Sequence, residues 1–188
     1  DPCLEYLVHL LTIEVPKLWG PFASSCIIKS TLDMLTGCML ENRFQSGYER
    51  LAQKFPRFVR RKSGNSEAYI FFNFPEAMFP EAINLGLYVH SIPGPVDVTD
   101  FVNDIFSYYK ERVLGNENNT YIVSEARRQK CPSIEVLEQT CQRTCAMHKH
   151  LKQKLAIADE RVLRKYCSYV DGMVTYHITN PRYRLEEI

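Results

Sequence analysis

The most informative segment of this chain is Val102-Asn103-Asp104-Ile105-Phe106-Ser107-Tyr108-Tyr109-Lys110-Glu111. Asn103, Ser107 and Glu111 are spaced four residues apart, so on a helix each step drifts by only ~40° and the three side chains share one stripe. They offer an amide oxygen, a hydroxyl oxygen and a carboxylate. This set suits Mg²⁺, which prefers oxygen ligands, and suits zinc poorly. The segment therefore predicts a helix with a candidate magnesium site.

The same spacing also has an ordinary explanation, because polar residues at helical intervals usually form the solvated side of an amphipathic helix. Two features favour the metal site. Lys110 places a cation directly beside the stripe, and the remaining residues of the segment are mostly apolar or aromatic. Spacing alone leaves both interpretations open.

Outside this segment, apolar residues recur at three- and four-residue steps along most of the chain, which predicts helices. The expected helices cover residues 4–15, 21–40, 48–61, 81–90, 96–113, 120–130, 133–158 and 159–178. Prolines and glycines separate them, and we expect the sharpest break at Pro93-Gly94-Pro95. Alternating polar and apolar positions, which are typical of strands, hardly occur. The sequence thus predicts an all-α fold in which residues 1–188 form a single domain.

Composition narrows the class of protein. With 23 basic and 22 acidic residues the net charge is +1, which gives no overall attraction to nucleic acid or to a membrane surface. No apolar run reaches the ~18 residues of a membrane span, and the start has no signal-like core. Seven cysteines without a framework spacing predict buried free thiols in a reducing compartment. We therefore expect a cytoplasmic protein that binds neither nucleic acid nor membranes.

Three motifs together resemble a known family. Asn-Asp-x-x-Ser-x-x-x-Glu at 103–111, with a lysine before the glutamate, is similar to the second metal motif of class I terpene synthases. Asn180-Pro181-Arg182-Tyr183-Arg184-Leu185 resembles their Arg-Tyr diphosphate clamp, and Phe55-Pro56-Arg57-Phe58-Val59-Arg60-Arg61 resembles the segment with the diphosphate-sensing arginine. The order and intervals also match. Trp19-Gly20-Pro21-Phe22 and residues 30–38 resemble the fungal trichodiene synthase family in particular.

The resemblance implies a fold, a reaction and a set of roles. The chain would be part of a class I terpenoid synthase helical bundle, acting on a prenyl diphosphate, with farnesyl diphosphate expected, and forming a sesquiterpene through a carbocation. Asn103, Ser107 and Glu111 would hold one Mg²⁺. The residues that would bind the substrate diphosphate are Arg60, Lys110, Arg182 and Tyr183. No catalytic residue is assigned, Arg61 and Arg184 are as well explained as surface charges, and a homodimer is left open.

A carbocation needs an apolar pocket, and aromatic faces can stabilise it at ~0.5–2 kcal/mol per ring. Candidates for the pocket wall are Phe22, Tyr88, Tyr176 and the aromatic residues at 69–79. Aromatic residues at helical spacing are more often simply core, so none of them is assigned a catalytic role.

The sequence departs from the family at one point. Class I cyclases need an aspartate-rich helix that faces the second metal helix, and in the family it precedes the Trp-Gly-Pro-Phe segment. Here the nearest acidic clusters are Asp97/Asp100/Asp104, which overlaps the metal helix itself, and Asp159-Glu160, which lies in a late turn. We therefore expect residues 1–188 to be the C-terminal part of a cyclase catalytic domain, without turnover by itself.

Other functions fit the sequence less well. One alternative is a catalytically inactive all-α scaffold or binding module. A chain-elongating prenyltransferase would require a second aspartate-rich motif in place of the Asn/Ser/Glu stripe. A zinc site at Cys141, Cys145, His148 and His150 would not have the spacing of a zinc knuckle.

Overall fold

The computed structural model describes residues 1–44, 47 and 52–188, and every regular element within them is a helix. The all-α prediction is confirmed. The α-helices are α1 (Pro2–His9), α2 (Val15–Leu18), α3 (Pro21–Arg43), α4 (Phe55–Ser63), α5 (Ser66–Phe71), α6 (Glu81–Tyr88), α7 (Pro93–Tyr108), α8 (Tyr121–Gln129), α9 (Ser133–Ala158) and α10 (Glu160–Thr179). Two π-helical turns, η1 (Leu10–Glu14) and η3 (Tyr109–Leu114), and three 3₁₀ turns, η2 (Val89–Ser91), η4 (Pro181–Tyr183) and η5 (Leu185–Glu187), complete the set.

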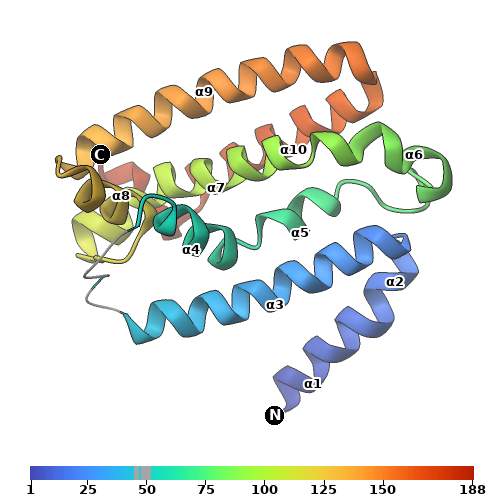
Figure 1. The fold of residues 1–188 in the computed structure, drawn as a ribbon, viewed down its shortest axis with the longest axis horizontal. Coiled ribbons are helices and arrows are strands. Elements are labelled where there is room, and N and C mark those ends of the chain that lie inside the picture. The colour runs from blue at the N-terminus through green and yellow to red at the C-terminus, as the bar shows by residue number, and fades with distance from the viewer. Residues whose placement is uncertain (45–46, 48–51) are drawn as a thin grey trace.

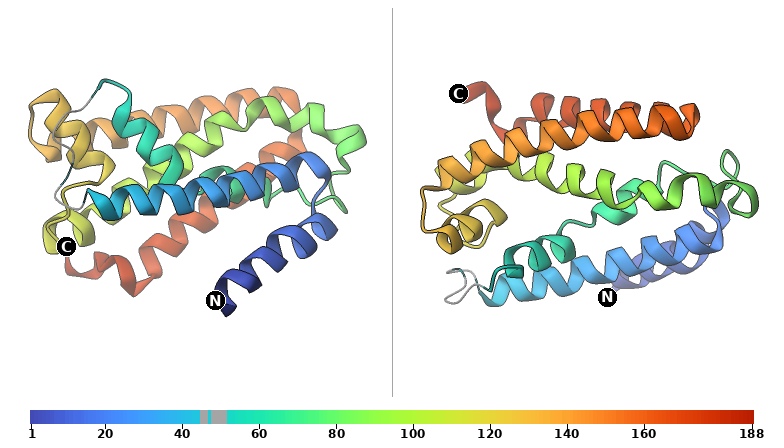
Figure 2. Two further views of the ribbon diagram at one scale, coloured as in Figure 1. Left: turned by 60° about the horizontal axis from the view of Figure 1, so that its bottom comes forward. Right: turned by 45° about the horizontal axis from the view of Figure 1, so that its top comes forward.

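Helix α7 lies at the centre of the molecule (Figure 1). Helices α9 and α10 pack against one side of it and α5 against the other, with α3 beyond α4 and α5. The run from α1 to α2 meets the start of α3 at a sharp turn and projects away from the other helices (Figure 2). At the opposite end, the C-terminal turn η4 returns to η3 at the end of α7. This return joins two distant parts of the sequence at the site described below.

The main core is formed between α3, α5, α7, α9 and α10. At one end of it the rings of Phe74 and Tyr88 stack with their centroids 4.2 Å apart, and Phe79 meets Tyr88 edge-on. Burial of each such side chain stabilises the fold by about 1.5–3 kcal/mol. A smaller cluster around Phe101 and Tyr121 lies between α7, α8 and α9. Helix α7 is therefore held by apolar packing over most of its length.

Helix starts show why these residues form these elements. Proline occupies the first turn of α3, α4 and α7, where its missing N–H breaks no hydrogen bond. The Asp159 carboxylate caps α10 by accepting from the backbone N–H groups of Arg161 and Val162. At α3 the cap is distant in sequence, because the Glu81 carboxylate accepts from the N–H groups of Phe22 and Ala23.

Several predicted boundaries need correction. Pro93-Gly94-Pro95 forms the first turn of α7 instead of a break before a helix at residue 96, because proline fits a first turn without loss. Of the helix predicted at 48–61, residues 48–51 lie outside the described part of the chain, and α4 begins only at Phe55.

The cysteines are free, as predicted, but none is buried: Cys3, Cys38 and Cys145 are exposed and the other four are half-buried. Within residues 1–44, 47 and 52–188, the structure contains no helix that is both long enough and apolar enough to cross a bilayer.

Candidate metal and diphosphate site

A cavity of about 830 Å³ opens between α4, α5, α7, α10 and the C-terminal turn. Its volume lies within the range of small-molecule binding sites. Four predicted site residues from three separate segments line it: Arg60, Asn103, Arg182 and Tyr183. The ammonium of Lys110 lies 5.7 Å from the centroid of the Tyr183 ring. The fold thus brings the predicted diphosphate-binding residues to one region.

The predicted metal stripe runs from α7 into η3. Asn103 and Ser107 are on the α-helical part, whereas Glu111 is on the π-helical turn. A π turn rotates by fewer degrees per residue than an α turn, so it offsets the drift that four residues of α-helix would give Glu111. Sequence periodicity offered no sign of this turn.

The oxygens of the stripe fit a cation. Ser107 is only 1 % exposed, and its Oγ has no hydrogen-bond partner among the described residues. A buried polar atom without a partner needs an explanation. Asn103 Oδ1 accepts from Arg60 at 3.2 Å, and the Glu111 carboxylate accepts from Lys110 at 2.5 Å. All three groups therefore present oxygen atoms that are either unsatisfied or already facing positive charge.

Arg60 is held tightly in the wall of the cavity although α4 is a short helix. Its Nε donates to Asp104 Oδ1 at 2.6 Å, and its Nη2 donates to the Asp100 carbonyl at 2.8 Å. Gly64 permits this arrangement, because a Cβ there would lie 2.4 Å from Arg60 Nη1 and 2.6 Å from Asp100 Oδ1. The guanidinium is therefore fixed, and the residue Arg60 as a whole is 8 % exposed.

The Arg-Tyr segment is built differently. The Asn180 side chain accepts from the backbone N–H of Arg182 at 3.0 Å and sets the η4 turn. Tyr183 is buried with its ring centroid 4.5 Å from that of His177. Arg182 is exposed, and no carboxylate of the described residues lies within ion-pair distance of it. Arg184 instead pairs with Glu187 at 2.5 Å on the surface.

Comparison with known proteins identifies the family of the chain. Residues 6–188 match the family described as "Trichodiene synthase (TRI5)". The chain belongs to the trichodiene synthase family.

Three relatives carry the names of terpene-forming synthases. The chain is 36% identical over 177 residues to "Terpene synthase 29" of Postia placenta. It is 27% identical over 187 residues to an (E)-beta farnesene synthase of Metarhizium brunneum, and 28% identical over 175 residues to the trichodiene synthase of Fusarium boothii. These matches cover 92%, 98% and 93% of this chain, but 50%, 56% and 46% of the relatives. The chain therefore spans about half the length of the curated relatives it matches.

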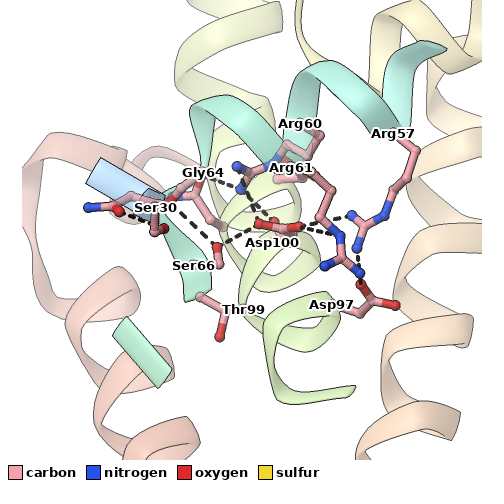
Figure 3. A network of polar contacts seen from close by, with 12 residues as sticks. Ser30, Arg57, Arg60, Arg61, Gly64, Ser66, Asp97, Thr99 and Asp100 are labelled. Carbon is pink, nitrogen blue, oxygen red and sulfur yellow. Dashed lines mark hydrogen bonds and ion pairs between the residues drawn. The ribbon is translucent and has the colours of Figure 1, made fainter. Parts of the chain in front are cut away.

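In this member of the trichodiene synthase family, the acidic cluster on α7 has a partner that sequence analysis missed. Asp97 forms ion pairs with Arg57 and Arg61 (Figure 3). The buried Asp100 binds Arg57 at 3.0 Å and accepts from Ser66 Oγ at 2.5 Å. The acidic residues of α7 are thus the counter-charges of the three arginines of α4. The available signal was a group of three arginines at 57, 60 and 61 on one predicted helix and a group of three aspartates at 97, 100 and 104 on another.

Burial perturbs the pKa values in this cluster. Loss of solvation raises the pKa of Asp104 to about 7. The positive charge of Arg60 lowers this pKa, whereas the negative charges of Asp100 and Glu111 raise it further. Burial works to lower the pKa of Arg60, but Asp104 and Asp100 outweigh it and raise that pKa above its ordinary value. Arg60 is therefore a permanent cation in the cavity wall.

The predicted aromatic wall divides into two groups. Tyr69 and Tyr176 line the cavity. Phe71, Phe74, Phe79 and Tyr88 belong to the packed core, and the exposed Phe22 contacts the buried Phe71. Tyr169, which the sequence did not single out, also lines the cavity.

Among the described residues, no group of three or more His, Cys, Asp or Glu side chains could hold a metal ion. His148, one member of the zinc alternative, contacts the Tyr166 hydroxyl at 2.9 Å instead. His177, which had no recognisable partner in the sequence, lies at the cavity with Nε2 3.2 Å from Asn103 Nδ2. Burial lowers the pKa of His177, with a smaller lowering from Lys110, although its hydrogen bond to the Met173 carbonyl works in the opposite direction.

Proposed function

We propose that this chain forms the second metal site and the diphosphate clamp of a terpene cyclase that acts on a prenyl diphosphate, with farnesyl diphosphate as the substrate. The reaction breaks the carbon–oxygen bond to diphosphate and closes the resulting carbocation to a sesquiterpene. One observation carries the proposal: Arg60, Asn103, Arg182 and Tyr183 border a single cavity. Membership of the trichodiene synthase family supports it.

The basic residues supply what departure of diphosphate requires. Diphosphate leaves poorly until its charge is neutralised by donors that are already in place. Arg182 presents an exposed planar guanidinium that can bind two phosphate oxygens at once, Arg60 supplies a fixed cation in the cavity wall, and Lys110 acts as a compact charge. Tyr183 adds a hydroxyl donor. Their origin in α4, η3 and η4 lets them approach one anion from different sides.

The metal stripe would complete this half of the site. Asn103 Oδ1, Ser107 Oγ and the Glu111 carboxylate would hold one Mg²⁺, in agreement with the orphaned hydroxyl of Ser107. When bound, Mg²⁺ neutralises charge on the diphosphate oxygens. Tyr69, Tyr169 and Tyr176 would exclude water from the cavity and offer aromatic faces to a cation.

We further propose that the aspartate-rich helix of the complete site is not contributed by residues 1–188. The curated relatives are about twice as long as their matched regions, which supports this division. The isolated chain would then bind diphosphate with Mg²⁺ but release none from farnesyl diphosphate. Mg²⁺-dependent release of diphosphate by the purified 188-residue chain would show that the division is wrong.

Isothermal titration of the chain with inorganic diphosphate in the presence of MgCl₂ tests the half-site. Arg182→Ala removes a charge-assisted donor, so we expect roughly 10- to 100-fold weaker binding. Arg164→Ala is the matched control, because the Arg164 side chain is 69% exposed and pairs with Glu160 on the surface of α10. Equal affinity of the wild type and Arg182→Ala would contradict the proposed clamp.

A binding module without chemistry is the second candidate. Leu4, Tyr6 and Val8 on α1 are each more than half exposed, and exposed apolar side chains in one element can mark an interaction surface. The titration separates the candidates, because a bare scaffold would bind neither Mg²⁺ nor diphosphate.

A further inference from the structure

His177 lies on α10 directly behind the metal stripe, and the proposed chemistry makes no use of it. The residue is 5 % exposed. Its Nε2 is 3.2 Å from Asn103 Nδ2, and its Nδ1 is 2.7 Å from the Met173 carbonyl oxygen. Both ring nitrogens are therefore within hydrogen-bond distance of a fixed partner.

The two ends of this hydrogen-bond chain determine the direction of every bond in it. Arginine can only donate, so the Asn103 atom that faces Arg60 at 3.2 Å must be the oxygen. The amide NH₂ then faces His177, whose Nε2 must accept. A backbone carbonyl can only accept, so Nδ1 carries the proton and donates to Met173. The donors run from Arg60 to Asn103, then to His177 and finally to Met173.

This direction decides which atom Asn103 can offer to a cation. A carboxamide turned by 180° would present its NH₂ group, which has no lone pair for a metal and would face the NH groups of Arg60. An unprotonated Nε2 at His177 can accept a hydrogen bond from Asn103 only when the carboxamide points its NH₂ group toward the ring and its oxygen away from it. One lone pair of that oxygen accepts from Arg60, and the other remains available.

We propose that His177 is a positioning residue, which holds the Asn103 carboxamide with its oxygen toward the metal site. This inference rests on the proposed function of Asn103 as a metal ligand. Packing alone does not require histidine here. The ring stacks with Phe106 at 5.5 Å and tilts against Tyr183 at 4.5 Å, and phenylalanine could make both contacts. Only the two hydrogen bonds need the imidazole.

The first test does not depend on metal. Long-range ¹H–¹⁵N spectra of the chain labelled at histidine distinguish the two neutral tautomers. We expect the proton of His177 on Nδ1 and an unprotonated Nε2. A proton on Nε2 would remove the acceptor for Asn103 and overturn the inference, whether or not the chain binds Mg²⁺.

The second test is a double-mutant cycle on binding of Mg²⁺ with inorganic diphosphate. His177→Phe keeps the ring packing and removes the acceptor, and loss of a partner that orients a ligand weakens metal binding by about 10–100-fold. His177→Gln can place an amide oxygen near the position of Nε2, so we expect it to recover most of the affinity. His148→Phe controls for loss of a half-buried histidine elsewhere on the helices.

Asn103→Asp provides the decisive background. A carboxylate has two equivalent oxygens, so no orientation needs to be selected, and His177→Phe should then have little further effect on Mg²⁺ affinity. A merely structural role of His177 would weaken binding equally in both backgrounds, and that result would contradict positioning. If the wild type binds no Mg²⁺ with diphosphate, both the proposed function and the positioning role fail. If the wild type binds and His177→Phe leaves that binding unchanged, only the positioning role is overturned.

Discussion

The two arginines that border the cavity occupy opposite environments. Arg60 is buried and its guanidinium is held by Asp104, Asp100 and Asn103. Arg182 is exposed on a short turn, and the described residues place no carboxylate within ion-pair distance of it. An anion that approaches Arg60 competes with carboxylates already bound, whereas an anion that approaches Arg182 displaces mainly water. The contacts of Arg60 on the α4–α7 side of the site are thus formed before ligand binds, whereas the guanidinium of Arg182 on the C-terminal side is available to the ligand.

The largest expected effect comes from disrupting the ion pairs between α4 and α7. Asp100→Asn removes the buried carboxylate that pairs with both Arg57 and Arg60, so that only Asp97 and Asp104 remain to balance them, and removing one partner of a buried pair is destabilising by about 3–5 kcal/mol. Urea unfolding followed by circular dichroism measures this change. Asp171→Asn, at an exposed position on α10, is the control. A loss below about 1 kcal/mol, the size of a surface pair, would mean that the α4–α7 network is not structural.

A smaller effect is expected from adding a side-chain atom beside the guanidinium of Arg60. Gly64→Ala places a Cβ 2.4 Å from Arg60 Nη1, so the guanidinium must shift, at a destabilisation of about 1–3 kcal/mol. Gly86→Ala on α6 meets nothing within 4 Å and should stabilise by up to about 1 kcal/mol. Thermal unfolding of both variants measures the contrast. Equal stability of the two would show that Arg60 does not depend on the close approach at Gly64.

Helix α10 leads toward the exposed Arg182, and its N-terminal cap, Asp159, lies at the opposite end of the helix. Asp159→Ala should destabilise the chain by about 1 kcal/mol at pH 7 and leave diphosphate affinity unchanged. The hydrogen bond from Arg161, followed by those from the backbone of Val162 and Arg161, lowers the pKa of Asp159 against a raising effect of burial. A lowered pKa means that the stabilisation is present above the unfolded value of about 3.9 and is lost as the pH falls below it. The difference between variant and wild type in thermal unfolding should therefore shrink toward pH 3.

The smallest effect is expected at the surface pair beside the free arginine. Glu187→Gln removes the partner of Arg184, and half-exposed pairs contribute about 0–1 kcal/mol. Chemical unfolding should detect little change, and diphosphate titration should detect none. A clear gain of affinity, from the Arg184 charge released by the substitution, would place Arg184 as well as Arg182 at the ligand.

Local patterns accounted for much of the fold. The helix predicted at 133–158 is α9 with the same bounds, because its start after Pro132 and its end before Asp159 are set by neighbouring residues. The stripe of Asn103, Ser107 and Glu111 follows from spacing alone, and the position of Asn103 at one cavity with Arg60 and Arg182 was implied only by the family resemblance.

Features that depend on distant partners were beyond sequence reasoning. The α3 cap comes from Glu81, which is 58 residues away from Ala23. His177 meets Asn103 across 74 residues, and the side chains themselves are not unusual. The acidic cluster on α7 was considered only as a metal motif, although its partners are the three arginines of α4. Helical periodicity reports which face is apolar, but it does not report which polar face another helix will meet.

The charge of α4 also bears on the order of folding. This helix has nine residues, which is shorter than the ~12–15 residues that isolated helices need in water. Its cations at positions 57, 60 and 61 repel one another at helical spacing. The carboxylates that relieve this repulsion lie 36 to 44 residues later in the chain. We therefore expect docking of α7 to stabilise α4, whose amides should gain protection from hydrogen exchange no earlier than those of α7.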